Sequence, residues 1–178
     1  MEITLEQLLK SRDQRWETER RLLEMFPGKT LVVLTVVMPG SVKRDARTAV
    51  IARAAEAAIN AYLGPKVVLT HRNDAQTGYE EYWITKGDAL SIKRQMCGIE
   101  ESHPLGRLFD IDVIRPDATP ISRPDVGFQP RRCLLCGQEA RWCMRNHTHT
   151  QEEIQQRINE MVNEFNAENR HLCTPTMR

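Results

Sequence analysis

The spacing of apolar residues predicts three helices, over residues 4–26, 45–63 and 150–168. Each begins at a side chain suited to cap a first helical turn: Thr4, Asp45 and Thr150. Thr4 with Gln7 and Thr150 with Glu153 have the spacing of capping boxes, and Pro-Gly or Gly-Pro pairs end the first two helices. The many alanines of residues 45–63 predict close packing of this helix against a sheet.

Short β-branched runs predict the strands. Residues 31–38 are continuously apolar, which is typical of a central strand buried on both faces. Further strands are expected over 66–70, 80–85 and 108–114, the first two joined by a polar loop, and residues 120–123 are a candidate to pair back with the last. Residues 88–100 slightly favour helix. This order predicts an α+β domain, with a mixed sheet and flanking helices.

The strand over 108–114 carries two aspartates, a residue that strands usually lack. Asp110 and Asp112 leave the same face of a strand, roughly 7 Å apart, whereas Phe109, Ile111 and Val113 face the other way. Adjacent carboxylates repel unless a divalent cation lies between them, so the pair is a candidate Mg²⁺ site. The alternative is an edge strand that carries acids on its solvated side.

Residues before the aspartates suit phosphate binding. Gly106 permits close approach of a phosphate to the backbone, and Arg107 offers a guanidinium fork. His103 either shapes the turn or contacts phosphate. Lys43 follows a glycine turn after the central strand, a geometry that binds phosphates but that also simply connects a strand to a helix.

Arg12 interrupts the apolar stripe of the first helix, and so does Glu19. The stripe is Leu5, Leu8, Leu9, Arg12, Trp16, Glu19, Leu23 and Phe26. Arg12 extends along the surface, pairs with Glu19, or points into a ligand cleft.

Composition limits the function classes. The 178 residues suit one domain, and 25 basic against 24 acidic residues argue against a general nucleic-acid or membrane-surface binder. No apolar run approaches the ~20 residues that span a bilayer, and the N-terminus lacks the features of a signal peptide. We therefore expect a cytoplasmic protein.

Residues 124–149 lack periodicity and hold three of the five cysteines. Cys133, Cys136, Cys143 and His149 have the spacing of a structural zinc site. The alternative is a set of buried thiols in an irregular segment. A redox role for the Cys-x-x-Cys pair is less favoured, because no adjacent helix N-terminus is evident.

With these motifs, the chain resembles the apo-citrate lyase phosphoribosyl-dephospho-CoA transferases, or holo-citrate lyase acyl-carrier-protein synthases. The resemblance covers most of the chain and is loose over 64–98. It rests on the strings Leu-Leu-Lys-Ser-Arg-Asp (8–13), Thr-Val-Val-Met-Pro-Gly (35–40), Ser-His-Pro-Leu-Gly-Arg-Leu-Phe-Asp-Ile-Asp (102–112) and Pro-Arg-Arg-Cys-Leu-Leu-Cys (130–136).

The resemblance implies a nucleotidyltransferase-like fold and transfer of 2′-(5″-triphosphoribosyl)-3′-dephospho-CoA to a serine of the citrate lyase acyl carrier protein, with release of diphosphate. Asp110 and Asp112 are then expected to hold Mg²⁺, and Arg107, with Arg12 and Lys43, to bind phosphates. Arg107 stands where the nucleotidyltransferase signature has a serine.

Arg131 and Arg132, with Arg123, are candidates to dock an acidic carrier. The alternatives are that they bind precursor phosphates or pair with local acids such as Asp125. The alternative function is a zinc-stabilised, non-catalytic binding or assembly module for the lyase complex.

Overall fold

The computed structural model describes residues 2–172, with the side chains of 170–172 left aside. The chain divides into two compact units, residues 1–130 and 131–178. The boundary falls within residues 124–149, for which the sequence predicts no regular element, and shortly before the expected irregular Cys/His segment 133–149. The expectation that all 178 residues form one domain stays a prediction.

The first unit is built on a four-stranded sheet in the order β2-β3-β1-β4. Its strands are β1 (Thr30–Val36), β2 (Val67–Ala75), β3 (Gly78–Thr85) and β4 (Phe109–Ile114). The α+β class and the central place of β1 are confirmed. A sheet with both parallel and antiparallel pairs was expected. All strand pairings among the described residues are instead antiparallel.

The hairpin of β2 and β3 is longer than predicted. His71, Arg72, Asn73 and Asp74 were expected in a polar loop, yet they pair with β3 up to a tight turn before Gly78. These four residues are exposed, because β2 is an edge strand. An edge strand with polar side chains looks like a loop when only the apolar pattern is considered.

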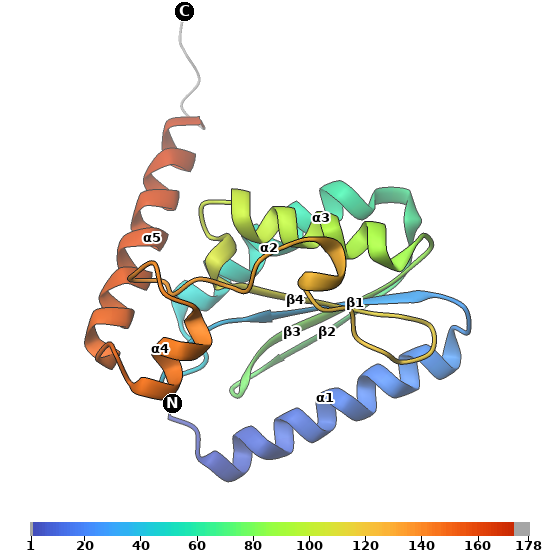
Figure 1. The fold of residues 1–178 in the computed structure, drawn as a ribbon, viewed down its shortest axis with the longest axis horizontal. Coiled ribbons are helices and arrows are strands. Elements are labelled where there is room, and N and C mark those ends of the chain that lie inside the picture. Colours follow the sequence, from blue (N-terminus) through green and yellow to red (C-terminus); the bar gives the residue numbers. More distant parts are fainter. Residues whose placement is uncertain (1, 173–178) are drawn as a thin grey trace, which may run out of the picture. The chain divides into compact units, whose positions relative to one another are not determined.

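Helices cover both faces of this sheet (Figure 1). Helix α1 (Leu5–Met25) lies on one face, and α2 (Ala46–Leu63) and α3 (Ala89–Ser102) lie on the other. The predicted caps at Thr4 and Asp45 are present, and the ambiguous segment 88–100 is helix α3, capped by Asp88. No helix in the described part of the chain is long and apolar enough to cross a membrane.

The α2/α3 face contains much of the apolar core. Its buried residues include Ile51, Ala52, Ala55, Ile59, Trp83, Ile92, Met96, Phe109, Ile111 and Val113. The small side chains of α2 allow the close packing that its alanines predicted.

The α1 face changes from apolar to polar along the strands. Leu22, Leu23 and Phe26 of α1 pack in one cluster with Leu31 and Ile114 of the sheet. One to three turns earlier, α1 turns Ser11, Arg15 and Glu19 inward, and all three are buried or half-buried.

The N-terminal half of α1 differs from its expected apolar stripe. Leu5, Leu9 and Trp16 are 70%, 48% and 62% exposed. The cluster around Leu22 and Leu23 fixes the rotation of α1, and the helical period then turns those three residues outward.

The second unit contains α4 (Ala140–Asn146) and α5 (Gln151–Leu172). Helix α4 was not predicted, because seven residues are too few to display an apolar period. The capping box of α5 is confirmed: the Thr150 amide donates to Glu153 Oε2, and the Glu153 amide donates to Thr150 Oγ1.

In the first unit, Pro120 and Ile121 pair back with the end of β4 as expected.

Candidate active site

Strand register places the two aspartates on the polar part of the α1 face. Asp110 lies opposite Thr35 of β1, and Thr35 in turn lies opposite Glu80 of β3. The next row is Asp112, Val33 and Tyr82. Residues opposite one another in a sheet share a face, so both aspartates lie on the same side as Glu80 and Tyr82. The predicted projection of Asp110 and Asp112 from one face is confirmed.

The aspartates differ in their access to water. The Asp110 residue is half-buried, whereas the Asp112 side chain is 62% exposed. Lys93 Nζ lies 4.0 Å from Asp112 Oδ1. Two carboxylates on one strand face, one of them well solvated, offer the hard oxygen donors that Mg²⁺ prefers. The donor set therefore fits the metal expected from the sequence.

Glu80 is a buried carboxylate that the sequence did not single out. It is 3% exposed, and its oxygens accept hydrogen bonds from Arg15 Nε (2.9 Å), Tyr82 Oη (2.7 Å) and Asn73 Nδ2 (3.2 Å). The buried oxygens of Glu80 are satisfied because a guanidinium and two neutral donors surround them. The two-residue period of a strand places Glu80 and Tyr82 on one face of β3, but it does not indicate that this face also carries Asp110.

Helix α1 adds two charged residues over this row. Arg15 contacts Glu80, and Glu19 lies within electrostatic reach of Arg15, Asp112 and Glu80. Burial raises the pKa of Glu19 to about 7, with Asp112 and Glu80 adding to the rise and Arg15 opposing it. Arg12 is exposed on the same helix.

The turn before β4 is held by local contacts. The Leu105 amide donates to His103 Nδ1 (3.0 Å), and the His103 ring lies 4.9 Å from the Phe109 ring. Burial lowers the pKa of His103. These contacts favour the turn-shaping role for His103.

Gly106 is required by packing. A Cβ atom there would lie 2.5 Å from the Glu100 carbonyl oxygen and 2.7 Å from that of Ile99, at the end of α3. Arg107 follows within a short 3₁₀ turn and is half-buried. Gly106 thus lets the chain cross the end of α3 and enter β4.

Lys43 belongs to the same end of the sheet as Asp110. Its Nζ donates to the Met38 carbonyl (2.6 Å), just beyond the end of β1. Burial lowers the pKa of Lys43. In this structure the Lys43 side chain therefore stabilises the turn between β1 and α2.

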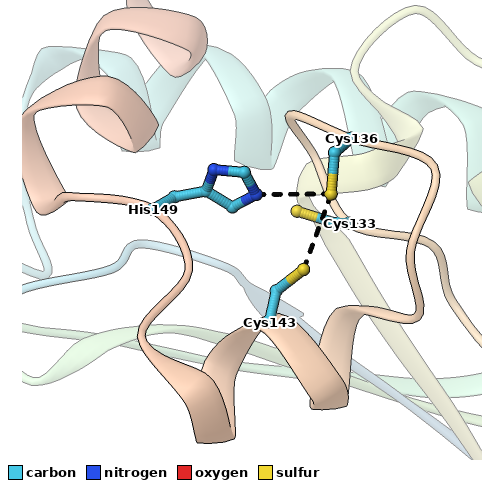
Figure 2. Close-up of side chains that lie close together, drawn as sticks. All are labelled: Cys133, Cys136, Cys143 and His149. Atoms are coloured by element: carbon cyan, nitrogen blue, oxygen red, sulfur yellow. Dashed lines mark hydrogen bonds between the residues drawn. The ribbon is translucent and has the colours of Figure 1, made fainter.

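The second unit brings the four predicted zinc ligands together (Figure 2). The ligand atoms of Cys133, Cys136, Cys143 and His149 all lie within 4.8 Å of one another. Cys136 Sγ lies 3.3 Å from His149 Nε2 and 3.6 Å from Cys143 Sγ. Cys133 and Cys136 come from one tight loop, Cys143 from α4, and His149 from the segment after α4. This donor set has the number and type of ligands of a structural zinc site.

The thiols of this cluster differ in acidity. Burial opposes ionisation of Cys133, but hydrogen bonds from the Leu135 and Cys136 amides and neighbouring thiols outweigh it and lower its pKa to about 7. Burial, with the neighbouring thiols, raises the pKa of Cys143 to about 11. Cys133 therefore ionises at a lower pH than Cys143.

The arginines proposed for docking lie in different settings. Arg123 forms ion pairs with Glu100 and Glu101 and donates to the Gln129 carbonyl, so it is part of the first unit's framework. Arg132 donates from Nη1 to the Gly137 carbonyl (2.7 Å) beside the cysteine loop and is exposed. Arg131 is half-buried and pairs through its carbonyl with the Ala140 amide.

Comparison with known proteins identifies relatives. A profile of the apo-citrate lyase phosphoribosyl-dephospho-CoA transferase family matches residues 3–165. The Escherichia coli (strain 536) protein of that name is 34% identical over 168 residues, which cover 93% of this chain and 91% of the relative.

Longer relatives also match. Protein CitXG of Haemophilus influenzae is 35% identical over 163 residues, 90% of this chain and 35% of the relative. Protein CitXG of Leuconostoc mesenteroides is 30% identical over 178 residues, 98% of this chain and 38% of the relative. The chain thus spans a little over a third of each CitXG protein. The matches extend across both units, and the chain belongs to the apo-citrate lyase phosphoribosyl-dephospho-CoA transferase family.

Proposed function

We propose that this chain transfers the 2′-(5″-triphosphoribosyl)-3′-dephospho-CoA group to a serine of the citrate lyase acyl carrier protein and releases diphosphate. The observation that carries the proposal is the pair Asp110 and Asp112 on one strand face, within a chain of this family. The reaction forms a bond between the serine oxygen and the α-phosphorus. It breaks the bond from that phosphorus to the diphosphate, and the serine loses its proton.

Asp110 and Asp112 would hold Mg²⁺. When bound, this ion neutralises charge on the triphosphate and the leaving diphosphate. β1 and the core beneath β4 fix the backbone of both aspartates, so the carboxylates are positioned before substrate arrives. Arg107, at the entry to β4, is our first candidate to bind phosphates, with Lys43 and Arg12 as further candidates.

Glu80 and Arg15 support this site from the side. Their ion pair joins α1 to β3 in the same row as Asp110. We propose that the pair fixes α1 over the polar part of the sheet. α1 thereby forms one wall of the space in which the triphosphate binds.

The Cys/His cluster is proposed to hold a structural zinc ion. Three thiols and one imidazole leave no ligand position for a substrate in a tetrahedral site. In this role the ion stabilises the loop around Cys136 together with α4, a region in which Cys143 is the one buried residue.

Mass spectrometry of the carrier subunit tests the function. We expect the purified chain, with precursor and Mg²⁺, to add the mass of the prosthetic group to the carrier, with one diphosphate released for each carrier modified. A folded chain that leaves the carrier mass unchanged would instead favour the non-catalytic assembly role. Modification that persists with excess chelator would contradict the Mg²⁺ site alone.

A further inference from the structure

The residue between the two aspartates is held from outside the sheet. The Ile111 amide donates to Glu100 Oε1 (2.8 Å), and the Ile111 carbonyl accepts from Lys93 Nζ (2.7 Å). β4 is an edge strand, so these backbone groups point away from β1. Both outward groups of one residue are thus bound by ionisable side chains.

Lys93 and Glu100 lie seven residues apart on α3, on one face of that helix. They are 4% and 2% exposed. Glu100 also pairs with Arg123, and Lys93 Nζ lies 4.0 Å from Asp112 Oδ1. A row of alternating charges, Arg123, Glu100 and Lys93, therefore follows the outer edge of β4 up to Asp112.

Covering a strand edge does not require such charges. Charged side chains are one of several devices that protect an edge strand; short strands, bulges, prolines and a covering helix or loop serve equally. Burial of a lysine and a glutamate has a large desolvation cost, and neutral groups could satisfy one amide and one carbonyl equally well. The use of two ionisable side chains at Ile111, midway between the two aspartates, therefore calls for an explanation tied to those aspartates.

We propose that Lys93 and Glu100 form an edge clamp that positions Asp110 and Asp112 to bind the divalent cation. The inference rests on the proposed function, since it concerns the same site. The clamp fixes the two peptide groups on either side of Ile111, and these peptides set the directions in which the flanking aspartate side chains leave the strand. Lys93 additionally restrains the solvated Asp112 carboxylate by its charge.

Binding of Mn²⁺ to the purified chain, followed by the EPR signal of the free ion, tests the clamp without substrate. We expect Lys93→Met to weaken Mn²⁺ binding about tenfold, the usual scale for losing a residue that orients a metal ligand. The control is Glu81→Gln. Glu81 is also buried, at 1% exposure, but it binds Tyr79 and Arg72, away from β4. Both variants should unfold at lower temperature, and only Lys93→Met should lose Mn²⁺ affinity.

A second measurement uses the unaltered chain, in case Lys93→Met does not fold. If clamp and metal are coupled, the coupling is reciprocal, so the metal must also stabilise the clamp. We expect saturating Mg²⁺ to slow hydrogen exchange of the Ile111 amide about tenfold relative to the Trp83 amide of β3, an estimate set by the same coupling.

The outcomes separate the clamp from the metal site. Lys93→Met with Mn²⁺ affinity within twofold of the unaltered chain overturns the clamp and leaves the metal site standing. If saturating Mg²⁺ leaves the hydrogen-exchange rate of the Ile111 amide unchanged, the clamp is likewise overturned and the metal site still stands. No Mn²⁺ binding by the unaltered, folded chain overturns the metal site and the clamp together.

Discussion

The carboxylate site and the Cys/His cluster are assembled in opposite ways. The carboxylate row joins Thr35, Glu80 and Asp110 from three strands, and Arg15 is added from a helix. The Cys/His cluster draws its four ligands from residues 133–149. The first depends on strand register over long sequence separations, and the second on two short loops and one helical turn. The two sites should therefore fail independently when their residues are changed.

The largest effect is expected at the aspartates. Asp110→Asn and Asp112→Asn should each lower the transfer rate by about 10³-fold, roughly 4 kcal/mol of transition-state stabilisation, because each removes a metal carboxylate. Mass spectrometry of the carrier gives the rate. The exposed Asp13→Asn is the control and should transfer normally. Near-normal transfer by either strand variant at saturating Mg²⁺ would contradict the metal site.

The matching change in the second unit is Cys136→Ser. Cys136 Sγ contacts both His149 and Cys143, so we expect loss of most bound zinc and a lower unfolding temperature. Metal analysis of protein purified without chelator measures the zinc. Cys97→Ser, a buried thiol outside the cluster, is the control and should keep its zinc. If the unaltered chain holds less than a tenth of an equivalent of zinc, the zinc site is contradicted and these cysteines are thiols without a metal.

These two changes also test independence directly. The aspartate variants should retain full zinc content, and Cys136→Ser should retain Mn²⁺ binding in its folded fraction. Loss of both metals after either change would show that the two units stabilise each other.

A smaller effect is expected on stability, where Arg15→Met should lower the free energy of unfolding more than Arg12→Met does. Arg15→Met leaves Glu80 buried without its cation, which should cost about 3 kcal/mol of unfolding free energy. Arg12→Met changes an exposed position and should stay within about 0.5 kcal/mol. Urea unfolding measures both. If Arg12→Met instead raises the KM for the precursor while Arg15→Met does not, Arg12 belongs to the phosphate site.

Charge reversal at Arg131 and Arg132 should have a moderate effect. If they dock an acidic carrier, the KM for the carrier should rise about threefold to tenfold at low salt, and less at high salt, because exposed charges act over a screened range. The KM for the precursor should change little. A rise in the precursor KM alone would instead assign these arginines to the triphosphate.

The smallest effect concerns pH. The pKa of Glu19 is raised to about 7 in the folded chain, so between pH 4.5 and 7 the folded state holds a proton that the unfolded state has lost. Stability should therefore fall as the pH rises through this range. Glu19→Gln cannot ionise and should be more stable than the unaltered chain at pH 8, with the gain vanishing near pH 4.5. Thermal unfolding without divalent ions measures this, and a gain that grows toward low pH would contradict the assignment.

The same contrast explains what the sequence could predict. Cys133, Cys136, Cys143 and His149 were predictable because zinc ligands close together in the chain have a recognisable spacing. Asp110 and Asp112 were predictable because the two-residue period of a strand is local. Glu80 was not, since nothing local indicates that β3 lies beside β1 with Glu80 opposite Thr35.

The rotation of α1 about its own axis was the other feature that the sequence could not predict. The apolar stripe placed Arg12 and Trp16 inward, but the sheet beneath that half of α1 is polar, so Arg15 and Glu19 face it instead. An amphipathic pattern predicts the buried face only where the partner surface is apolar. The edge clamp was equally hidden, because Lys93 and Glu100 look like ordinary surface residues of α3.

The central position of β1 has a consequence for how the chain folds. The β2–β3 hairpin closes locally, whereas Thr35 must meet Glu80 after 45 residues and Asp110 after 75. Closing such long loops is slow compared with forming a hairpin. We therefore expect the acidic row to be completed late, when β4 joins the sheet, so that the mutual repulsion of its carboxylates does not hinder the earlier steps. Synthesis of the chain from its N-terminus reinforces this order, because β4 is the last strand to be made.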